Sequence, residues 1–139
     1  PALGELLYAE SGQGAFLNGQ AVAVSAVSEL SAAQVSFGGL DYFERAGQSG
    51  NMLAVVRGAG RVRGFGDAYA YHLLASGRCE VVLEAQISIW DIAALSVIIR
   101  EAGGRCTDLQ GGAIGLETAS MLASNGATLH DDIRQIFAD

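Results

Sequence analysis

The segment from Cys79 to Asp108 most constrains the fold, because it reads as a strand, a helix and a second strand in direct succession. Residues 79–84 form a short, largely apolar run of the kind found in buried strands. After Asp91, apolar residues recur at helical spacing, at Ile92, Leu95, Ile98, Ile99 and Ala102. Gly103 and the glycine after it supply the left-handed residue that commonly ends a helix, and a strand is expected near 105–108. Such alternation favours an α/β fold.

The rest of the chain continues the pattern, with no internal repeat or linker. Antiparallel hairpins are expected over residues 5–25, where alternating segments are separated by glycine turns. The further predicted elements are strands at 34–37, 61–63 and 120–123 and helices at 42–57, 67–76 and 128–137. Gly38 and Gly39 close the first of these strands. We therefore predict one α/β domain, an α+β layered sandwich.

Composition excludes several function classes. The 139 residues carry a net charge of −7, which argues against nucleic-acid binding, since phosphate backbones need a basic surface. All eight basic residues are arginines, so a Schiff-base lysine and a Walker-type phosphate lysine are excluded from this chain. No apolar run approaches the roughly 20 residues of a membrane span, and we expect no membrane partner.

The cysteines and histidines offer no metal site of their own. Cys79 and Cys106 form no CxxC motif and have no histidine at zinc spacing, so we interpret them as buried thiols of a cytoplasmic protein. His72 lies in an apolar helical segment and is interpreted as structural. His130 is predicted to lie on the surface near a helix start.

Three acidic residues are placed where a ligand could meet them. Asp67 and Asp91 each begin a predicted helix, and Glu84 ends a predicted strand. Strand ends and helix starts on one edge of an α/β sheet are the usual ligand positions, so the three carboxylates are expected to share a cleft. Taken singly, each has a plainer interpretation: the two aspartates as helix caps and the glutamate as a solvated strand end.

The turn before Asp67 is a weak candidate for phosphate binding. Gly64-Phe-Gly66 lacks the full GxGxxG pattern, and the carboxylate of Asp67 would repel a phosphate. Recognition of a substrate hydroxyl or amine suits this turn better.

Three motifs together resemble the C-terminal signature of the inositol monophosphatase family of metal-dependent phosphatases. These are Trp90-Asp91-x-Ala-Ala, then Glu101-Ala-Gly-Gly, then Thr107-Asp108-Leu-x-Gly. The resemblance covers essentially the whole chain and implies alternating layers of helices and sheets. It also implies hydrolysis of a small-molecule phosphate ester by water activated on Mg²⁺ or Mn²⁺.

The resemblance assigns roles residue by residue. Asp91 matches a magnesium ligand, and no other catalytic residue is expected in this chain. Glu84 matches an acidic position that contacts hydroxyl or amino groups of the substrate. Gly66, Asp67 and Ala68 match a substrate-recognition loop.

The family's other metal motif, Asp-Pro-x-Asp-Gly-Thr, is absent from this sequence. We therefore expect the chain to be the C-terminal portion of a longer enzyme and to be nearly inactive alone. Residues 1–58 are expected to hold the end of the N-terminal sheet region and a connecting helix, and residues 59–139 a C-terminal α/β subdomain. A homodimer is a further expectation from the family.

Within the family, Gly66-Asp67-x-Tyr69-x-Tyr71 looks most like the histidinol-phosphatase branch. An additional carboxylate suits a substrate that carries an ammonium group and an imidazole. Inositol 1-phosphate or a related sugar phosphate is the alternative substrate, and Glu84 is compatible with it. A non-catalytic module for binding or dimerisation is the alternative from another class.

Overall fold

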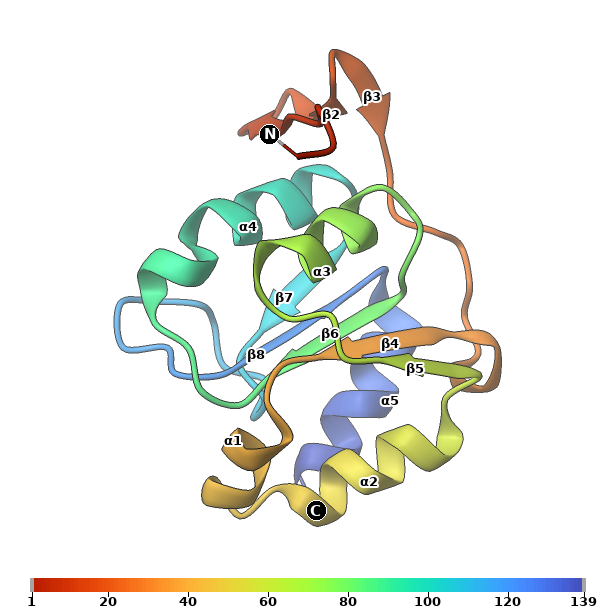
Figure 1. Ribbon diagram of the computed structural model, residues 1–139, viewed down its shortest axis with the longest axis vertical. Helices are drawn as coiled ribbons and strands as arrows, with labels where there is room; N and C mark the ends of the chain where they lie inside the picture. The colour runs from red at the N-terminus through yellow and green to blue at the C-terminus, as the bar shows by residue number, and fades with distance from the viewer. Residues whose placement is uncertain (1, 139) are drawn as a thin grey trace.

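The computed structural model describes residues 2–138 and consists of alternating sheet and helix layers (Figure 1). A three-stranded antiparallel sheet contains β1 (Leu7–Glu10), β2 (Gly14–Leu17) and β3 (Gln20–Val22). It covers a layer made by α3 (Asp67–Ala75) and α4 (Ile89–Glu101). A five-stranded sheet follows, and α1 (Leu40–Arg45), α2 (Ser49–Gly58) and α5 (Ala127–Ala138) lie on its other face. The predicted α/β layered sandwich is confirmed.

The five-stranded sheet is mixed, and its parallel half places the site. Its order is β5 (Arg61–Arg63), β4 (Gln34–Phe37), β6 (Val81–Glu84), β8 (Met121–Ser124) and β7 (Arg105–Thr107). β4 pairs in parallel with both β5 and β6, whereas β8 is antiparallel to β6 and β7. The carboxyl ends of β5, β4 and β6 therefore meet at one edge, where ligands bind in open α/β sheets.

Two hydrophobic clusters hold the layers together, one on each face of the five-stranded sheet. The first packs α3 and α4 between the two sheets, with Leu74, Ile92 and Ile99 fully buried. The second packs α2 and α5 against the opposite face around Val55 and Ile133. All four residues of β6 are buried, as expected for a strand covered on both faces.

The small sheet is fixed to α4 by a carboxylate at the end of that helix. Glu101 accepts hydrogen bonds from the backbone N–H groups of Gly12 and Gly14, each at 2.9 Å. These hydrogen bonds lower the pKa of Glu101, and the bond from Gly12 has the largest effect. The hairpin turn between β1 and β2 is thereby tied to the end of α4.

The helix expected over residues 42–57 is two helices, so that prediction is wrong. α1 ends at Arg45 and α2 begins at Ser49. Gly47 between them adopts φ +70°, a left-handed conformation that ends a helix. α3 and α4 agree with the sequence pattern, since Gly77 and Gly103 adopt φ +73° and +89° just beyond them.

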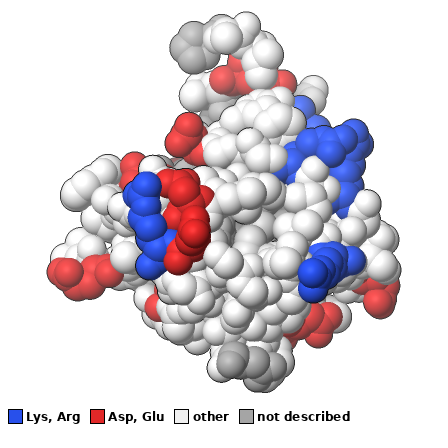
Figure 2. All heavy atoms as spheres, turned by 60° about the horizontal axis from the view of Figure 1, so that its bottom comes forward, with Lys and Arg blue, Asp and Glu red and all other residues white. Residues whose placement is uncertain are grey.

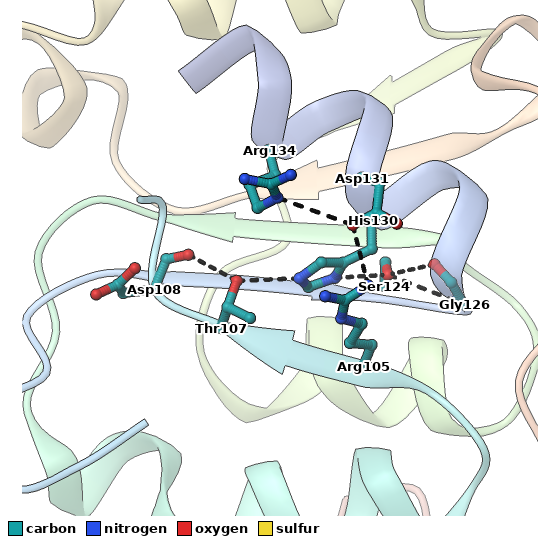
Figure 3. Close-up of polar contacts among 8 residues, drawn as sticks. All are labelled: Arg105, Thr107, Asp108, Ser124, Gly126, His130, Asp131 and Arg134. Carbon is teal, nitrogen blue, oxygen red and sulfur yellow. Dashed lines mark hydrogen bonds and ion pairs between the residues drawn. The ribbon is translucent and has the colours of Figure 1, made fainter. Parts of the chain in front are cut away.

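His130 is buried, which corrects the prediction that it lies on the surface. Figure 3 shows its ring between two hydroxyl groups. Nδ1 lies 2.9 Å from Ser124 Oγ and Nε2 lies 3.0 Å from Thr107 Oγ1. Burial, followed by the nearby charge of Arg105, lowers the pKa of His130 to about 4. The histidine joins α5 to β7 and β8 as a neutral imidazole.

The two cysteines and the second histidine, His72, have structural roles. Cys79 and Cys106 are free and buried, as expected. Burial raises the pKa of both thiols, that of Cys106 to about 12. His72 Nε2 lies 2.7 Å from Glu5 Oε2, an ion-pair distance, although the angles are not those of a hydrogen bond. His72 thus connects α3 to the segment before β1.

Charged side chains are dispersed over the face shown in Figure 2. On the face in Figure 2, basic side chains lie in separate small groups, with uncharged and acidic surface between them. Among residues 2–138, no helix is long and apolar enough to cross a membrane.

The division of the chain at residues 58 and 59 stays a prediction. β4 precedes that point, and its two neighbours, β5 and β6, follow it. Sheet pairing favours a boundary between β3 and β4 instead, because β1–β3 form a sheet of their own.

Candidate active site

A cleft of about 840 Å³ opens at the carboxyl ends of the parallel strands. Its walls come from the segment after β4, the turn after β5, the end of β6 and the starts of α3 and α4. The predicted site residues all line it: Gly66, Asp67, Ala68, Glu84 and Asp91. The structure therefore brings together residues separated by up to 25 positions in the sequence, at the edge that the strand pattern indicated.

The turn that carries Asp67 is held to the sheet by a buried hydroxyl. Ser36 in β4 is fully buried and donates from Oγ to the carbonyl oxygen of Phe65 at 2.7 Å. Asp67 itself adopts φ +56° and is exposed at the start of α3. Non-glycine residues rarely take this conformation, although aspartate tolerates it better than most. Such backbone strain is often found at functional sites.

Glu84 is a buried carboxylate beside two other acids. Only 6% of its surface is exposed, and its carboxylate lies against Gly38, where a side chain would collide with it. Burial raises the pKa of Glu84 to about 7, and the charges of Asp67 and Asp91 contribute. At neutral pH its carboxyl group is therefore divided between its acidic and basic forms.

Asp91 begins α4 and faces the cleft. It is the third residue of the helix, and its Oδ2 accepts a hydrogen bond from the backbone N–H of Ser88 at 2.9 Å. The capping interpretation of Asp91 is thus correct for this oxygen. The residue also lines the cleft with its side chain exposed, so a capping role and a ligand role are compatible.

The other acids of the three sequence motifs hold the fold. Glu101 binds the hairpin turn, as described above. Asp108 Oδ1 accepts from the backbone N–H groups of Gln110, at 2.9 Å, and Gly112, at 2.6 Å, and so closes a turn after β7. Of the motif acids, Asp91 is the one that lines the cleft.

The carboxylates of the cleft provide part of a binding site for a hard divalent cation. Mg²⁺ prefers carboxylate oxygens, keeps several waters and uses few protein ligands, so an exposed aspartate in a cleft suits it. Among residues 2–138, no three histidine, cysteine or acidic side chains are grouped closely enough to hold a metal ion. Asp91 can therefore supply one ligand, while Asp67 and Glu84 do not complete a cage around it.

Charge in the cleft has a single sign. Asp41 lines the cleft together with the three predicted acids, and no lysine or arginine does so among the described residues. Asp41 is partly neutralised by Arg45, whose guanidinium lies 2.9 Å from its Oδ2. Walls of one sign raise the local concentration of cations and cationic groups.

The sequence interpretation missed several cleft residues, among them Tyr71, Gly38 and Gly39. Tyr71 lies one helical turn after Asp67, and that spacing could have revealed it. Gly38 and Gly39 directly follow β4, at the same sheet edge as the predicted acids. The close approach of Glu84 to Gly38 depends on the pairing of β4 with β6, which no local pattern encodes.

Comparisons with known proteins agree with this geometry. The model of the inositol monophosphatase family matches residues 1–139. A histidinol-phosphatase of Chlorobaculum parvum is 42% identical over 127 residues, which are 91% of this chain and 49% of the relative. An inositol-1-monophosphatase of Rhizobium meliloti is 39% identical over 132 residues, 90% of this chain and 48% of the relative.

A solved structure agrees as well. The inositol monophosphatase of Thermotoga maritima superposes with a TM-score of 0.85 at 32% identity, over 99% of this chain and 52% of that one. The chain thus spans about half the length of the relatives that it matches. Because the family model matches from the first residue to the last, the chain belongs to the inositol monophosphatase family of phosphatases.

Proposed function

We propose that this chain contributes the substrate side and one metal ligand of a phosphatase that hydrolyses a small hydroxylated phosphate monoester. The observation that carries the proposal is the meeting of Asp67, Glu84 and Asp91 in one cleft with no basic residue among its described walls. In this proposal, Asp91 holds Mg²⁺ or Mn²⁺, and further ligands come from sequence outside these 139 residues. The bound ion would supply charge neutralisation and an activated water.

The substrate that we propose is histidinol phosphate. Its ammonium and imidazole groups can be matched by carboxylates, whereas a polyol needs hydrogen bonds without net charge. The acidic cleft and the relative named histidinol-phosphatase both support this choice. Inositol 1-phosphate is the second candidate, since a relative of nearly equal identity is named an inositol-1-monophosphatase.

The test is phosphate release by the complete protein, with L-histidinol phosphate and inositol 1-phosphate as alternative substrates and with or without Mg²⁺. We expect metal-dependent turnover with a preference for histidinol phosphate. A preference for the inositol ester would leave the metal role standing and would contradict histidinol phosphate as the substrate. If neither ester were hydrolysed, another phosphate ester or the alternative of a non-catalytic binding or dimerisation module would be favoured.

Asp67 is the proposed selector between the two substrates. Asp67→Asn removes the charge and keeps a residue type that tolerates its left-handed backbone. Because exposed charge pairs contribute at most about 1 kcal/mol, we expect a roughly fivefold loss of kcat/KM for histidinol phosphate. Turnover of inositol 1-phosphate should change little. Equal losses for both substrates would show that Asp67 does not select between them.

Gly38 provides a test of Glu84 that leaves the glutamate in place. In Gly38→Ala, the new methyl group would collide with the Glu84 carboxylate, and the flexible side chain would turn away. We expect KM for the substrate to rise about tenfold, as for the loss of one hydrogen bond to a charged group. Gly64→Ala is the matched control in the same cleft, since its methyl group would meet Phe37 at an ordinary 3.9 Å. A similar KM in both variants would contradict the role of Glu84.

The remaining properties are proposals for the whole protein. We propose a cytoplasmic homodimer that acts in histidine biosynthesis, in keeping with the substrate above. The isolated chain is expected to release little or no phosphate, because Asp91 alone cannot hold two metal ions. Fast turnover by residues 1–139 alone would contradict this expectation.

A further inference from the structure

One buried polar group that lines the cleft has no hydrogen-bond partner among the described residues. The hydroxyl of Tyr71 is buried, with 2% of the residue exposed, and makes no hydrogen bond. The Glu84 carboxylate lines the same cleft and lies against Gly38, and 6% of the residue is exposed. Buried donors and acceptors are nearly always satisfied in native proteins, so the unpaired hydroxyl of Tyr71 in this cleft calls for an explanation.

The two groups lie on elements that pack against each other. Tyr71 and Glu84 both line the cleft, from α3 and from the end of β6. After burial, the charge of Glu84 is the strongest influence that raises the pKa of Tyr71, ahead of Cys106 and Asp91. The tyrosine hydroxyl therefore stays protonated and can act as a hydrogen-bond donor.

We propose that Tyr71 is a positioning residue whose hydroxyl donates a hydrogen bond to the Glu84 carboxylate when substrate is bound, and so orients Glu84 toward the non-phosphate part of the substrate. The inference deepens the proposed function and rests on the substrate-contact role of Glu84. A change in the side-chain torsions of the glutamate is the motion that pairs the two groups. Charge-assisted hydrogen bonds of this kind are short and strong, and they fix the direction of a carboxylate.

This role differs from a structural one in its effect on stability. A hydroxyl without a partner contributes nothing favourable when buried, so its removal in Tyr71→Phe leaves the melting temperature unchanged or higher. Tyr69→Phe is the matched control on the same helix, because Tyr69 is 42% exposed and does not line the cleft.

The experiment is a double-mutant cycle in the complete protein with Mg²⁺, using the phosphate ester that the unaltered enzyme hydrolyses best. We expect Tyr71→Phe to lower kcat/KM about three- to tenfold, with the inhibition constant of inorganic phosphate unchanged. Glu84→Gln should cost more, and the double variant should be no worse than Glu84→Gln alone, since a positioning residue acts through its partner.

Each other outcome overturns the proposal. If the losses of kcat/KM in the two single variants multiplied in the double variant, Tyr71 would contact the substrate independently of Glu84. An unchanged kcat/KM in Tyr71→Phe would remove the role of the hydroxyl, and a lowered melting temperature would make that role structural. Failure of the histidinol phosphate proposal is seen separately, in the substrate preference of the unaltered enzyme, and leaves this cycle measurable with another ester.

Discussion

Asp91→Asn in the complete protein is expected to lower metal-dependent kcat by roughly three orders of magnitude, because charge stabilisation by a bound metal ion is worth several kcal/mol. The amide is a poorer ligand for a hard divalent cation than the carboxylate. Its oxygen can still accept the hydrogen bond from Ser88, so the start of α4 should remain intact. Phosphate release at a series of Mg²⁺ concentrations measures the effect, and the melting temperature checks the fold.

Asp132→Asn is the matched control. Asp132 is exposed on α5, on the opposite side of the five-stranded sheet from α4, and it does not line the cleft. Its replacement should leave both kcat and the dependence on Mg²⁺ unchanged. Normal turnover by Asp91→Asn, with the usual metal dependence, would show that Asp91 is not a ligand.

Acid should destabilise the protein through His130. Its pKa is about 4 in the folded state against 6.5 for an ordinary histidine, so the unfolded chain binds a proton that the folded one excludes. The stability that the neutral imidazole contributes is fully present above pH 6.5 and is lost as the pH falls toward 4. The loss amounts to about 3 kcal/mol in the free energy of unfolding.

Urea unfolding at pH 7 and pH 4.5 measures this loss, with His130→Gln as the comparison. Glutamine stays neutral at both pH values, and its amide can reach the hydroxyls of Ser124 and Thr107, the partners of the imidazole. The unaltered protein should lose more stability between the two pH values than the variant does. Equal losses would mean that His130 does not couple folding to pH.

Periodicity predicted most of the elements, since each depends on a local pattern. The helical spacing after Asp91 and the glycine pair at its end correspond to α4. The buried run before Glu84 corresponds to β6. The exception is the helix expected over 42–57, which Gly47 divides. There the left-handed preference of a single glycine outweighed the helical pattern on either side.

The sequence by itself determined which residues are the candidates to bear the chemistry. Asp67, Glu84 and Asp91 stand at element ends, and element ends can be read from local patterns. Their meeting could also be expected, because the carboxyl ends of parallel strands share an edge.

Tertiary structure alone decided the surroundings of those residues. The contact of Glu84 with Gly38 follows from the register of β4 on β6, and the orphaned hydroxyl of Tyr71 follows from the packing of α3 above them. His130 is polar and lies near a helix start, so it resembles a surface residue in sequence, yet in the folded structure its ring lies between the hydroxyls of Thr107 and Ser124. Burial and partners depend on contacts between segments distant in the chain, and for this reason the pKa values and the hydrogen bonds of the site appear only in the folded structure.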